Sequence, residues 1–297
     1  MPNPSNKISV ATVGKAILAG EHAVLYGASA LAIPLPLLKL NLEIQTCEIG
    51  EARFLFDNQA VNGTVKEVIL SACKKFNINP ETIQVCATSD IPIGAGLGSS
   101  AALCVGLVQA FAKIQDLALD HRKVYELATE LENRFHGQSS GLDCAVVTYQ
   151  KPLLFKRHHQ PEFVDFELPK GFFLIDSLKR TATQIMVDRT ARHFQNDSTL
   201  AGQFDDCCNL TITALHQKSP DLLAQSIRQL HHLHNKIEIV GELNEIIDVS
   251  LECGALAAKI TGAGGGGCIL CYAPDKTEQV YENMRQKLPN TKVFRIS

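Results

Sequence analysis

The sequence predicts a fold that contains both strands and helices and divides into two parts, and three observations lead to this prediction. The chain has 297 residues, a length that suits two domains or one large one. Residues 8–50 alternate apolar and polar side chains, as antiparallel strands do, whereas several later segments have apolar residues at helical spacing. A polar segment, 150–170, separates the N-terminal part of the chain from the C-terminal part and marks the predicted domain boundary.

Composition is typical of a globular protein and argues against two classes of partner. Hydrophobic residues make up 45% of the chain and charged residues 20%, as in an average folded protein. The formal net charge of −3 gives no positive field that would attract nucleic acid or an anionic membrane. The most apolar segment, 23–42, is interrupted by Pro34, Pro36 and Lys39, so we interpret it as strands and turns. We expect no nucleic-acid or membrane partner, and the lack of a signal-peptide pattern in residues 1–7 predicts a cytoplasmic protein.

The ten cysteines are interpreted as buried small hydrophobic residues in a reducing compartment, because several lie in apolar sequence. Cys268 and Cys271 form a Cys-x-x-Cys pair in a predicted apolar strand. No second pair accompanies them, so a structural role is favoured over metal or redox chemistry.

The first chemically distinctive segment is 14–27, where a predicted strand carrying Lys15 turns at Gly20 and presents Glu21 and His22. Charged side chains this close to apolar sequence are costly to bury without partners. The alternative is a surface turn with solvated charges, and the segment alone does not decide between them.

A predicted helix, 64–78, and a predicted strand, 82–88, lead into a glycine-rich loop with the sequence Ile91-Pro-Ile-Gly-Ala-Gly-Leu-Gly-Ser-Ser-Ala-Ala102. Alternating glycines let a backbone approach a ligand closely. Ser99 or Ser100 is expected to cap the helix that follows, whose N-terminus would then bind phosphate. The loop has neither the lysine of a Walker A motif nor the spacing of a dinucleotide fingerprint. An ordinary capping turn is the alternative.

Two carboxylates follow this loop. The helix after Ser100 is apolar on nearly all sides and is expected to be central, and Asp120 is expected to cap the next helix. Glu132 lies at the edge of that helix's apolar face, either as a boundary carboxylate or pointing into a cleft. Asp143 follows a loop of small residues and precedes a predicted strand, 145–149. On a turn of this kind an aspartate is either a turn former or a functional group.

The second half is predicted to contain a strand, 171–177, and three helices, 183–194, 200–217 and 220–239. The last helix carries three histidines, which we interpret as a solvated helix face rather than a metal site: His231, His232 and His234.

A second glycine-rich segment runs Lys259-Ile-Thr-Gly-Ala-Gly-Gly-Gly-Gly-Cys268. It matches a dinucleotide pattern literally, but a strand follows it where that pattern needs a helix. We expect its backbone to lie close to a ligand.

These three segments together resemble, in order and spacing, the GHMP small-molecule kinases. Gly20-Glu-His-Ala-Val24, the later Tyr26-Gly27 and the 259–268 segment are most similar to the mevalonate kinase group. The resemblance covers nearly the whole chain.

The resemblance implies a fold and an activity. The fold is an α+β two-domain GHMP kinase fold, with an N-terminal domain like ribosomal S5 domain 2 over 1–168 and a ferredoxin-like C-terminal domain over 169–297. ATP and substrate would meet in the cleft between them. The implied activity is ATP-dependent phosphorylation of the primary hydroxyl of mevalonate, in isoprenoid precursor biosynthesis. The implied partners are small molecules, and a homodimer is compatible with the resemblance.

The resemblance also implies roles for individual residues. Asp143 and Lys15 match the catalytic pair, and Ser100 and Glu132 match the ligands of a Mg²⁺ ion. The nucleotide-binding positions are Pro92, Gly94, Ala95, Gly96, Leu97, Gly98, Ser99 and Ser100. The positions expected to contact substrate are Glu21, His22, Thr183 and Gly264. A cation, His22 or Lys15, near the substrate would suit a carboxylate group.

The chain departs from the family pattern in three places. Thr12-Val-Gly-Lys15 replaces Ala-Pro-Gly-Lys, and Leu178-Lys-Arg-Thr-Ala-Thr183 replaces Lys-Val-Pro-Arg-Ser-Thr. In the loop that usually reads Gly-Asn-Pro-Ser-Gly-x-Asp-Asn, Gln138, Ser139 and Cys144 replace Asn, Pro and Asn.

These differences leave two other functions open. The chain could be another GHMP kinase, such as a phosphomevalonate or sugar kinase, or a catalytically inactive ligand sensor. A nicotinamide-dependent oxidoreductase is disfavoured by the strand after Gly267.

Overall fold

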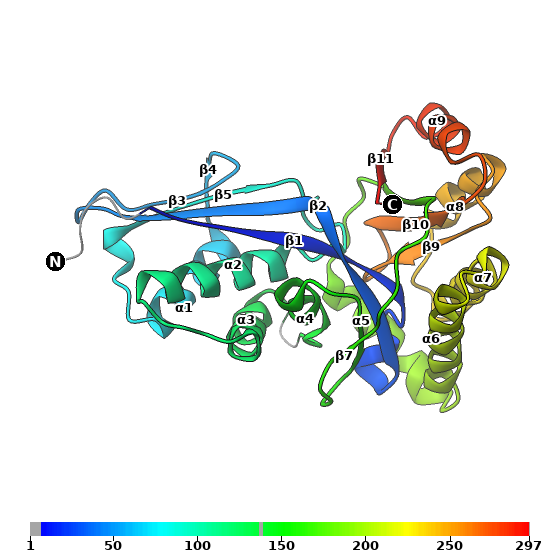
Figure 1. Cartoon of the computed structure of the whole chain (residues 1–297), viewed down its shortest axis with the longest axis horizontal. Coiled ribbons are helices and arrows are strands. Elements are labelled where there is room, and N and C mark those ends of the chain that lie inside the picture. Colours follow the sequence, from blue (N-terminus) through cyan, green and yellow to red (C-terminus); the bar gives the residue numbers. More distant parts are fainter. Residues whose placement is uncertain (1–6, 137–138, 297) are drawn as a thin grey trace. The chain divides into compact units, whose positions relative to one another are not determined.

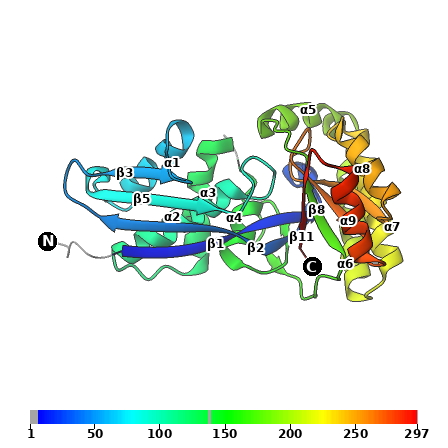
Figure 2. The same ribbon diagram turned by 90° about the horizontal axis from the view of Figure 1, so that it is seen from above.

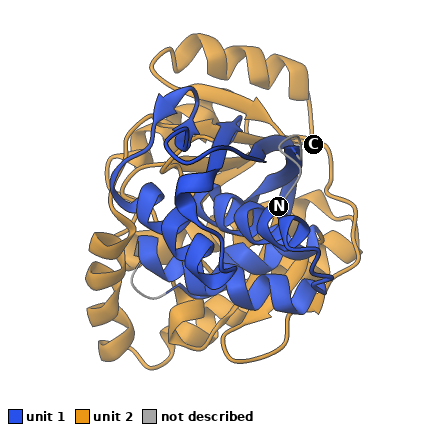
Figure 3. Cartoon of the chain, turned by 90° about the vertical axis from the view of Figure 1, so that its left-hand side faces the viewer, with its two compact units in different colours: residues 1–15, 34–91, 98–150 blue, residues 16–33, 92–97, 151–297 orange. Residues whose placement is uncertain are grey.

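The computed structural model describes residues 7–136 and 139–296. The chain forms two compact units (Figure 3). Unit 1 consists of Met1–Lys15, Pro34–Ile91 and Gly98–Gln150, and unit 2 of Ala16–Ile33, Pro92–Leu97 and Lys151–Ser297. Both units thus draw on the N-terminal half, and the single boundary expected after residue 168 stays a prediction.

Unit 1 is a sheet with helices along one face (Figure 1). The strand order is β4-β3-β5-β2, and β1 pairs with β2. The strands are β1 (Lys7–Ala19), β2 (Ser29–Thr46), β3 (Arg53–Phe56), β4 (Gln59–Ala60) and β5 (Ile83–Ser89), of which β1 and β2 continue into unit 2. The helices are α1 (Gly63–Lys75), the short 3₁₀ helix η2 (Pro80–Thr82), α2 (Ser99–Ile114), α3 (His121–His136) and α4 (Leu142–Tyr149).

Helix α2 is the central helix of unit 1, as its sequence predicts. Gly106 of this helix faces Leu42 of β2. A Cβ at position 106 would lie 3.5 Å from Leu42 Cδ2, which is an ordinary van der Waals distance. The hydroxyl of Thr12 in β1 donates to the carbonyl of Ala102 at 2.9 Å. An apolar helix surface and a buried threonine therefore fix α2 against the first strands of the unit.

Two local predictions in unit 1 are wrong, and one is confirmed. Residues 145–149 are helical, since a continuous apolar run does not distinguish a buried strand from a buried helix. Helix α2 is capped by Gly98 in the left-handed conformation, with no side-chain cap from a serine. The Asp120 carboxylate does accept the backbone N–H of Lys123 at 2.7 Å at the start of α3.

Unit 2 contains a four-stranded antiparallel sheet with helices packed on it (Figure 2). The order is β11-β8-β10-β9, with β8 (Phe172–Asp176), β9 (Ala257–Thr261), β10 (Cys268–Tyr272) and β11 (Lys292–Arg295). Its helices are η1 (Ala23–Tyr26), α5 (Thr183–Asn196), α6 (Leu200–His216), α7 (Pro220–Lys236), α8 (Leu243–Glu252) and α9 (Thr277–Lys287). Two further strands, β6 (Leu153–Lys156) and β7 (Glu162–Phe163), extend from the start of β2.

The two inner strands of this sheet, β8 and β10, are buried along their whole length, and helices α7 and α8 contact β9. Cys268 and Cys271 are both fully buried in β10, in agreement with a structural role. Among the described residues, no helix combines the length and the apolar character needed to cross a bilayer.

Gly171 provides a test of packing in unit 2. It has φ +96°, and a Cβ there would lie 2.4 Å from the Ala273 carbonyl oxygen, whereas Gly27 has φ +88° and open space around it. We expect G171A to lower the free energy of unfolding by about 2–4 kcal/mol and G27A by about 1 kcal/mol, because only the first adds a backbone clash to the left-handed strain. Urea unfolding of both variants measures this, and equal losses would contradict the packing argument.

Candidate functional site

The structure brings Lys15 and Asp143, the two expected catalytic residues, together within unit 1. Lys15 lies on β1 with its side chain 2% exposed, and its Nζ is 3.1 Å from Oδ2 of Asp143. Asp143 lies in the first turn of α4, where the helix dipole favours a negative charge, and its side chain is 28% exposed. The result is a buried cation whose partner carboxylate still reaches solvent. A surface turn with solvated charges, the alternative for Lys15, is therefore wrong.

Gly98, directly before α2, leaves space for the side chain of Lys15. It has φ +78°, and a Cβ there would lie 2.8 Å from Lys15 Cγ. Any larger residue would displace the lysine stem. Helix α2 begins at the next residue, so its N-terminal amides and the positive end of its dipole lie next to this lysine. This is a suitable environment for an anionic group.

Glu132 is almost completely buried in unit 1, at 1% exposure, and its carboxylate accepts hydrogen bonds from Ser100, Ser139 and Cys144. Ser100 Oγ lies 3.2 Å from Oε1, while Ser139 Oγ lies 2.6 Å and Cys144 Sγ 3.3 Å from Oε2. Glu132 is therefore not an ordinary boundary carboxylate.

A hydroxyl and a carboxylate oxygen lie together at Ser100 and Glu132, and Mg²⁺ prefers such ligands. In the described part of the chain, no group of three or more His, Cys, Asp or Glu side chains could hold a metal ion. A Mg²⁺ ion at this position would therefore take its remaining ligands from phosphate and water, as Mg²⁺ commonly does. The donor set fits the ion.

The first half of the first glycine-rich loop, residues 92–97, packs in unit 2 against the second glycine-rich segment. The Cys268 amide donates to the Ala95 carbonyl at 3.1 Å. A Cβ on Gly96 would lie 2.9 Å from the Thr261 carbonyl oxygen, and one on Gly267 would lie 2.7 Å from that of Ala95. Backbone-to-backbone packing therefore already requires glycine at these two positions, and the expected close approach of this backbone to a ligand stays a prediction.

Two expected substrate contacts, Gly264 in the second glycine-rich segment and Thr183 at the start of α5, both belong to unit 2. A Cβ on Gly264 would lie 2.3 Å from the Ile239 carbonyl oxygen, so packing within unit 2 already requires glycine there. Thr183 is half-buried at the first position of α5. Their contact with substrate stays a prediction.

Arg180, which sequence reasoning missed, ties this loop to β8. Its guanidinium forms a two-pronged ion pair with the buried Asp176, at 2.7 and 2.8 Å, and its Nε donates to the Ile93 carbonyl at 2.7 Å. The Arg180 Cδ would be 3.2 Å from a Cβ on Gly94. The only signal in the sequence was the departure from the family pattern over 178–183.

A second set of buried charges surrounds Glu21 in unit 2. Glu21 is fully buried, forms an ion pair with Lys259 on β9, and has its Oε2 3.2 Å from Nε2 of His234 on α7. Burial alone would raise the pKa of Glu21, but the charge of Lys259 and the adjacent His234 lower it to about 2. A surface turn with solvated charges is thus wrong for Glu21. The solvated helix face is also wrong for His234, which is buried, although His232 is exposed.

His22 is a neutral imidazole held by unit 2. Its Nε2 donates to the Ala263 carbonyl at 2.7 Å, and its Nδ1 lies 3.4 Å from Thr190 Oγ1. Burial lowers the pKa of His22 to about 4, so the ring is uncharged near neutral pH. Of the two cations expected to suit a substrate carboxylate, His22 or Lys15, the neutral His22 ring is therefore excluded, and the role of Lys15 stays a prediction.

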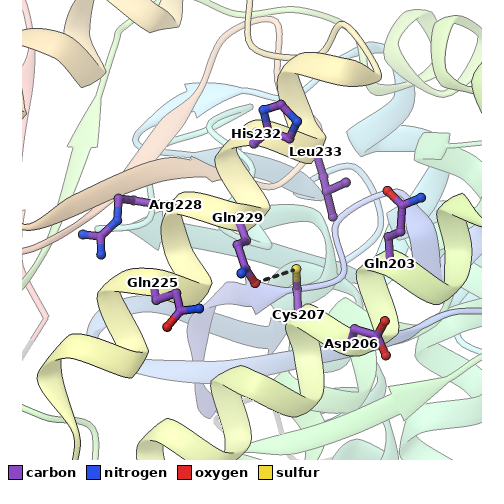
Figure 4. A pocket seen from close by; sticks show the side chains of 8 residues that line it. All are labelled: Gln203, Asp206, Cys207, Gln225, Arg228, Gln229, His232 and Leu233. Carbon is purple, nitrogen blue, oxygen red and sulfur yellow. Dashed lines mark hydrogen bonds between the residues drawn. The ribbon is translucent and has the colours of Figure 1, made fainter.

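A surface pocket of about 570 Å³ lies between α6 and α7, and Cys207 and Gln229 meet across it (Figure 4). Residues of these two helices line it: Gln203, Asp206, Cys207, Gln225, Arg228, Gln229, His232 and Leu233. None of the expected site residues is among them, so the pocket plays no part in the site.

Comparison with known proteins identifies one family. The model of the GHMP kinases N terminal domain matches residues 63–151, and that of the GHMP kinases C terminal matches 211–290. A mevalonate kinase of Archaeoglobus fulgidus is 30% identical over 263 residues, covering 86% of this chain and 89% of the relative.

Solved structures agree on the fold. The mevalonate kinase of L. major in complex with R-mevalonate has a TM-score of 0.86 at 21% identity, covering 99% of this chain and 98% of its own. The Streptococcus pneumoniae phosphomevalonate kinase, in complex with phosphomevalonate and AMPPNP, has a TM-score of 0.82 at 19% identity, covering 97% and 100%.

Removing Lys259 should strongly destabilise unit 2. The K259M substitution leaves the fully buried Glu21 carboxylate without its cation, and we expect a loss of about 3–5 kcal/mol in the free energy of unfolding. The matched control is K179M, which removes an exposed pair with Glu242 and should change little. Urea unfolding measures both, and the second substitution E21Q in K259M should recover part of the loss. Similar effects of K259M and K179M would contradict the buried ion pair.

Stability should also fall as the pH falls from 6.5 to 4. In this window an unfolded His22 binds a proton that the folded protein excludes, because burial lowers its pKa from 6.5 to about 4. A difference of this size corresponds to about 3 kcal/mol. Urea unfolding at several pH values should show a shallower slope in H22N, since asparagine tolerates the positive φ of this position. An unchanged slope would show that His22 is protonated in the folded state.

Proposed function

The chain belongs to the GHMP kinase family, and on that premise we propose that it acts as a mevalonate kinase, transferring the γ-phosphoryl group of ATP to the primary hydroxyl of mevalonate. The observation that carries the proposal is the buried ion pair between Lys15 and Asp143, in which the carboxylate stays accessible. The choice of mevalonate rests on the relatives, which are named mevalonate kinase.

Asp143 acts as the base and Lys15 as the electrostatic stabiliser. Phosphoryl transfer has a loose transition state, so catalysis depends mostly on alignment and charge stabilisation. The carboxylate accepts a hydrogen bond from the primary hydroxyl, aligns its oxygen and takes the proton late in the transfer. The ammonium group of Lys15 stabilises the negative charge that develops on the oxygens.

The nucleotide binds along the glycine-rich loop, 92–100, and at the N-terminus of α2. Backbone amides and the helix dipole there favour phosphate oxygens. Ser100 and Glu132 would hold Mg²⁺, which would supply positive charge to neutralise the phosphate oxygens. Glu21, Thr183 and Gly264 are proposed to lie around the mevalonate, and His22 to order that region as a neutral ring.

The free state of all ten cysteines, which all lie in the described residues, supports a reducing compartment such as the cytoplasm. A homodimer stays a prediction.

The direct test is ADP release with Mg²⁺ and ATP in the presence of mevalonate, phosphomevalonate or galactose. Saturable turnover confined to mevalonate is the expected result. Turnover with another alcohol would replace the substrate and keep the kinase chemistry. ATP binding without turnover on any substrate would point to a ligand sensor and contradict the proposal.

Substitution of the ion pair should abolish turnover and spare nucleotide binding. We expect D143A and K15M each to lower kcat by at least about 100-fold, because proton transfer and charge stabilisation are lost, with the Kd for ATP nearly unchanged. The matched control is D120A, which removes another aspartate at a helix N-terminus and should cost about 1 kcal/mol of stability with kcat intact. Turnover near the normal rate in D143A and K15M would remove both residues from the mechanism.

A further inference from the structure

We propose that Ser139 is a positioning residue that orients the metal-binding carboxylate of Glu132, with Cys144 as its partner. The inference rests on the proposed function, because it concerns the Mg²⁺ ion that accompanies ATP. Ser139 and Cys144 stand where the family pattern has proline and asparagine. Since proline has no side-chain donor, the arrangement belongs to this chain rather than to the family pattern.

The two oxygens of Glu132 have different surroundings. Oε2 accepts from both Ser139 Oγ, at 2.6 Å, and Cys144 Sγ, at 3.3 Å, whereas Oε1 accepts from Ser100 Oγ at 3.2 Å. Ser100 is the other proposed Mg²⁺ ligand. Two donors on Oε2 restrict rotation of the carboxylate plane and so hold Oε1 beside Ser100. Partners behind a ligand set its orientation in this way at many metal sites.

Ser139 is itself fixed at both ends. Its amide donates to Asn133 Oδ1 at 2.7 Å, which ties it to α3, and its Oγ accepts the amide of Gly141 at 3.1 Å. Because the Gly141 amide occupies one lone pair, the hydroxyl proton is directed at Glu132. Gly141 caps α4, whose first turn carries Asp143. Ser139 therefore links the metal-binding carboxylate on α3 to the helix that carries the catalytic base.

The test compares S139A with S140A. Both remove a serine hydroxyl from the same loop. Ser139 Oγ donates to Glu132, whereas Ser140 Oγ accepts the amide of Leu142 at 3.3 Å. Binding of Mn²⁺ in the presence of a non-hydrolysable ATP analogue, followed by electron paramagnetic resonance, gives a readout that requires no turnover. We expect S139A to weaken Mn²⁺ binding about tenfold and to raise the Mg²⁺ concentration for half-maximal activity by the same factor. S140A should leave metal binding unchanged, and S139T, which keeps the hydroxyl, should restore it.

Cys144 provides an independent check if S139A unfolds. C144A should weaken Mn²⁺ binding by a smaller factor, because a thiol is a weak donor, while C144S keeps a donor and should retain binding. Unchanged Mn²⁺ binding in both S139A and C144A would overturn the proposal, as would an equal loss in S140A. If the wild type bound Mn²⁺ with nucleotide but phosphorylated no alcohol, a selective loss in S139A would still support the positioning role, and only the proposed function would fail.

Discussion

The need to pair buried charges governs both units of this protein. In unit 1, Lys15 is buried against Asp143, and the carboxylate of Glu132 accepts hydrogen bonds from side chains that include Ser139 and Cys144. In unit 2, Glu21 is buried between Lys259 and His234. Leaving any of these groups without its partner would cost several kcal/mol, so each pair fixes the elements that carry it. The same pairs hold the proposed base Asp143, the cation Lys15 and the proposed Mg²⁺ ligand Glu132 on helices and strands of unit 1.

Close backbone packing is the second constraint, and it already requires glycine at several positions of the two glycine-rich segments. The 92–97 and 262–267 segments touch backbone to backbone in unit 2, and Arg180 holds the first of them to Asp176 of β8. In unit 1, the absence of a side chain at Gly98 leaves space for the Lys15 side chain. If the glycine-rich loop binds phosphate as proposed, these contacts within the protein mean that it needs little reorganisation when the anion binds, which favours alignment of the transferred group.

Sequence reasoning succeeded where the signal was local and failed where it depended on tertiary contacts. The helical periodicity of 99–114 and the cap at Asp120 follow from local patterns, and the structure confirms both. The strand expected at 145–149 is a helix, because an apolar run is compatible with either. His234 looked solvated because its partner, Glu21, is more than two hundred residues away in sequence. The pairing of Lys15 with Asp143 came from family resemblance, since spacing alone does not bring the two together.

The central claim is that the Asp143 carboxylate directs the γ-phosphoryl group of ATP to a primary alcohol. Phosphorus NMR of the product formed from mevalonate and Mg²⁺-ATP tests it most directly. The account predicts a new phosphate-ester resonance split into a triplet by the protons of the adjacent methylene group, absent with D143A. Inorganic phosphate as the only new product, or an ester resonance of equal size with D143A, would contradict it.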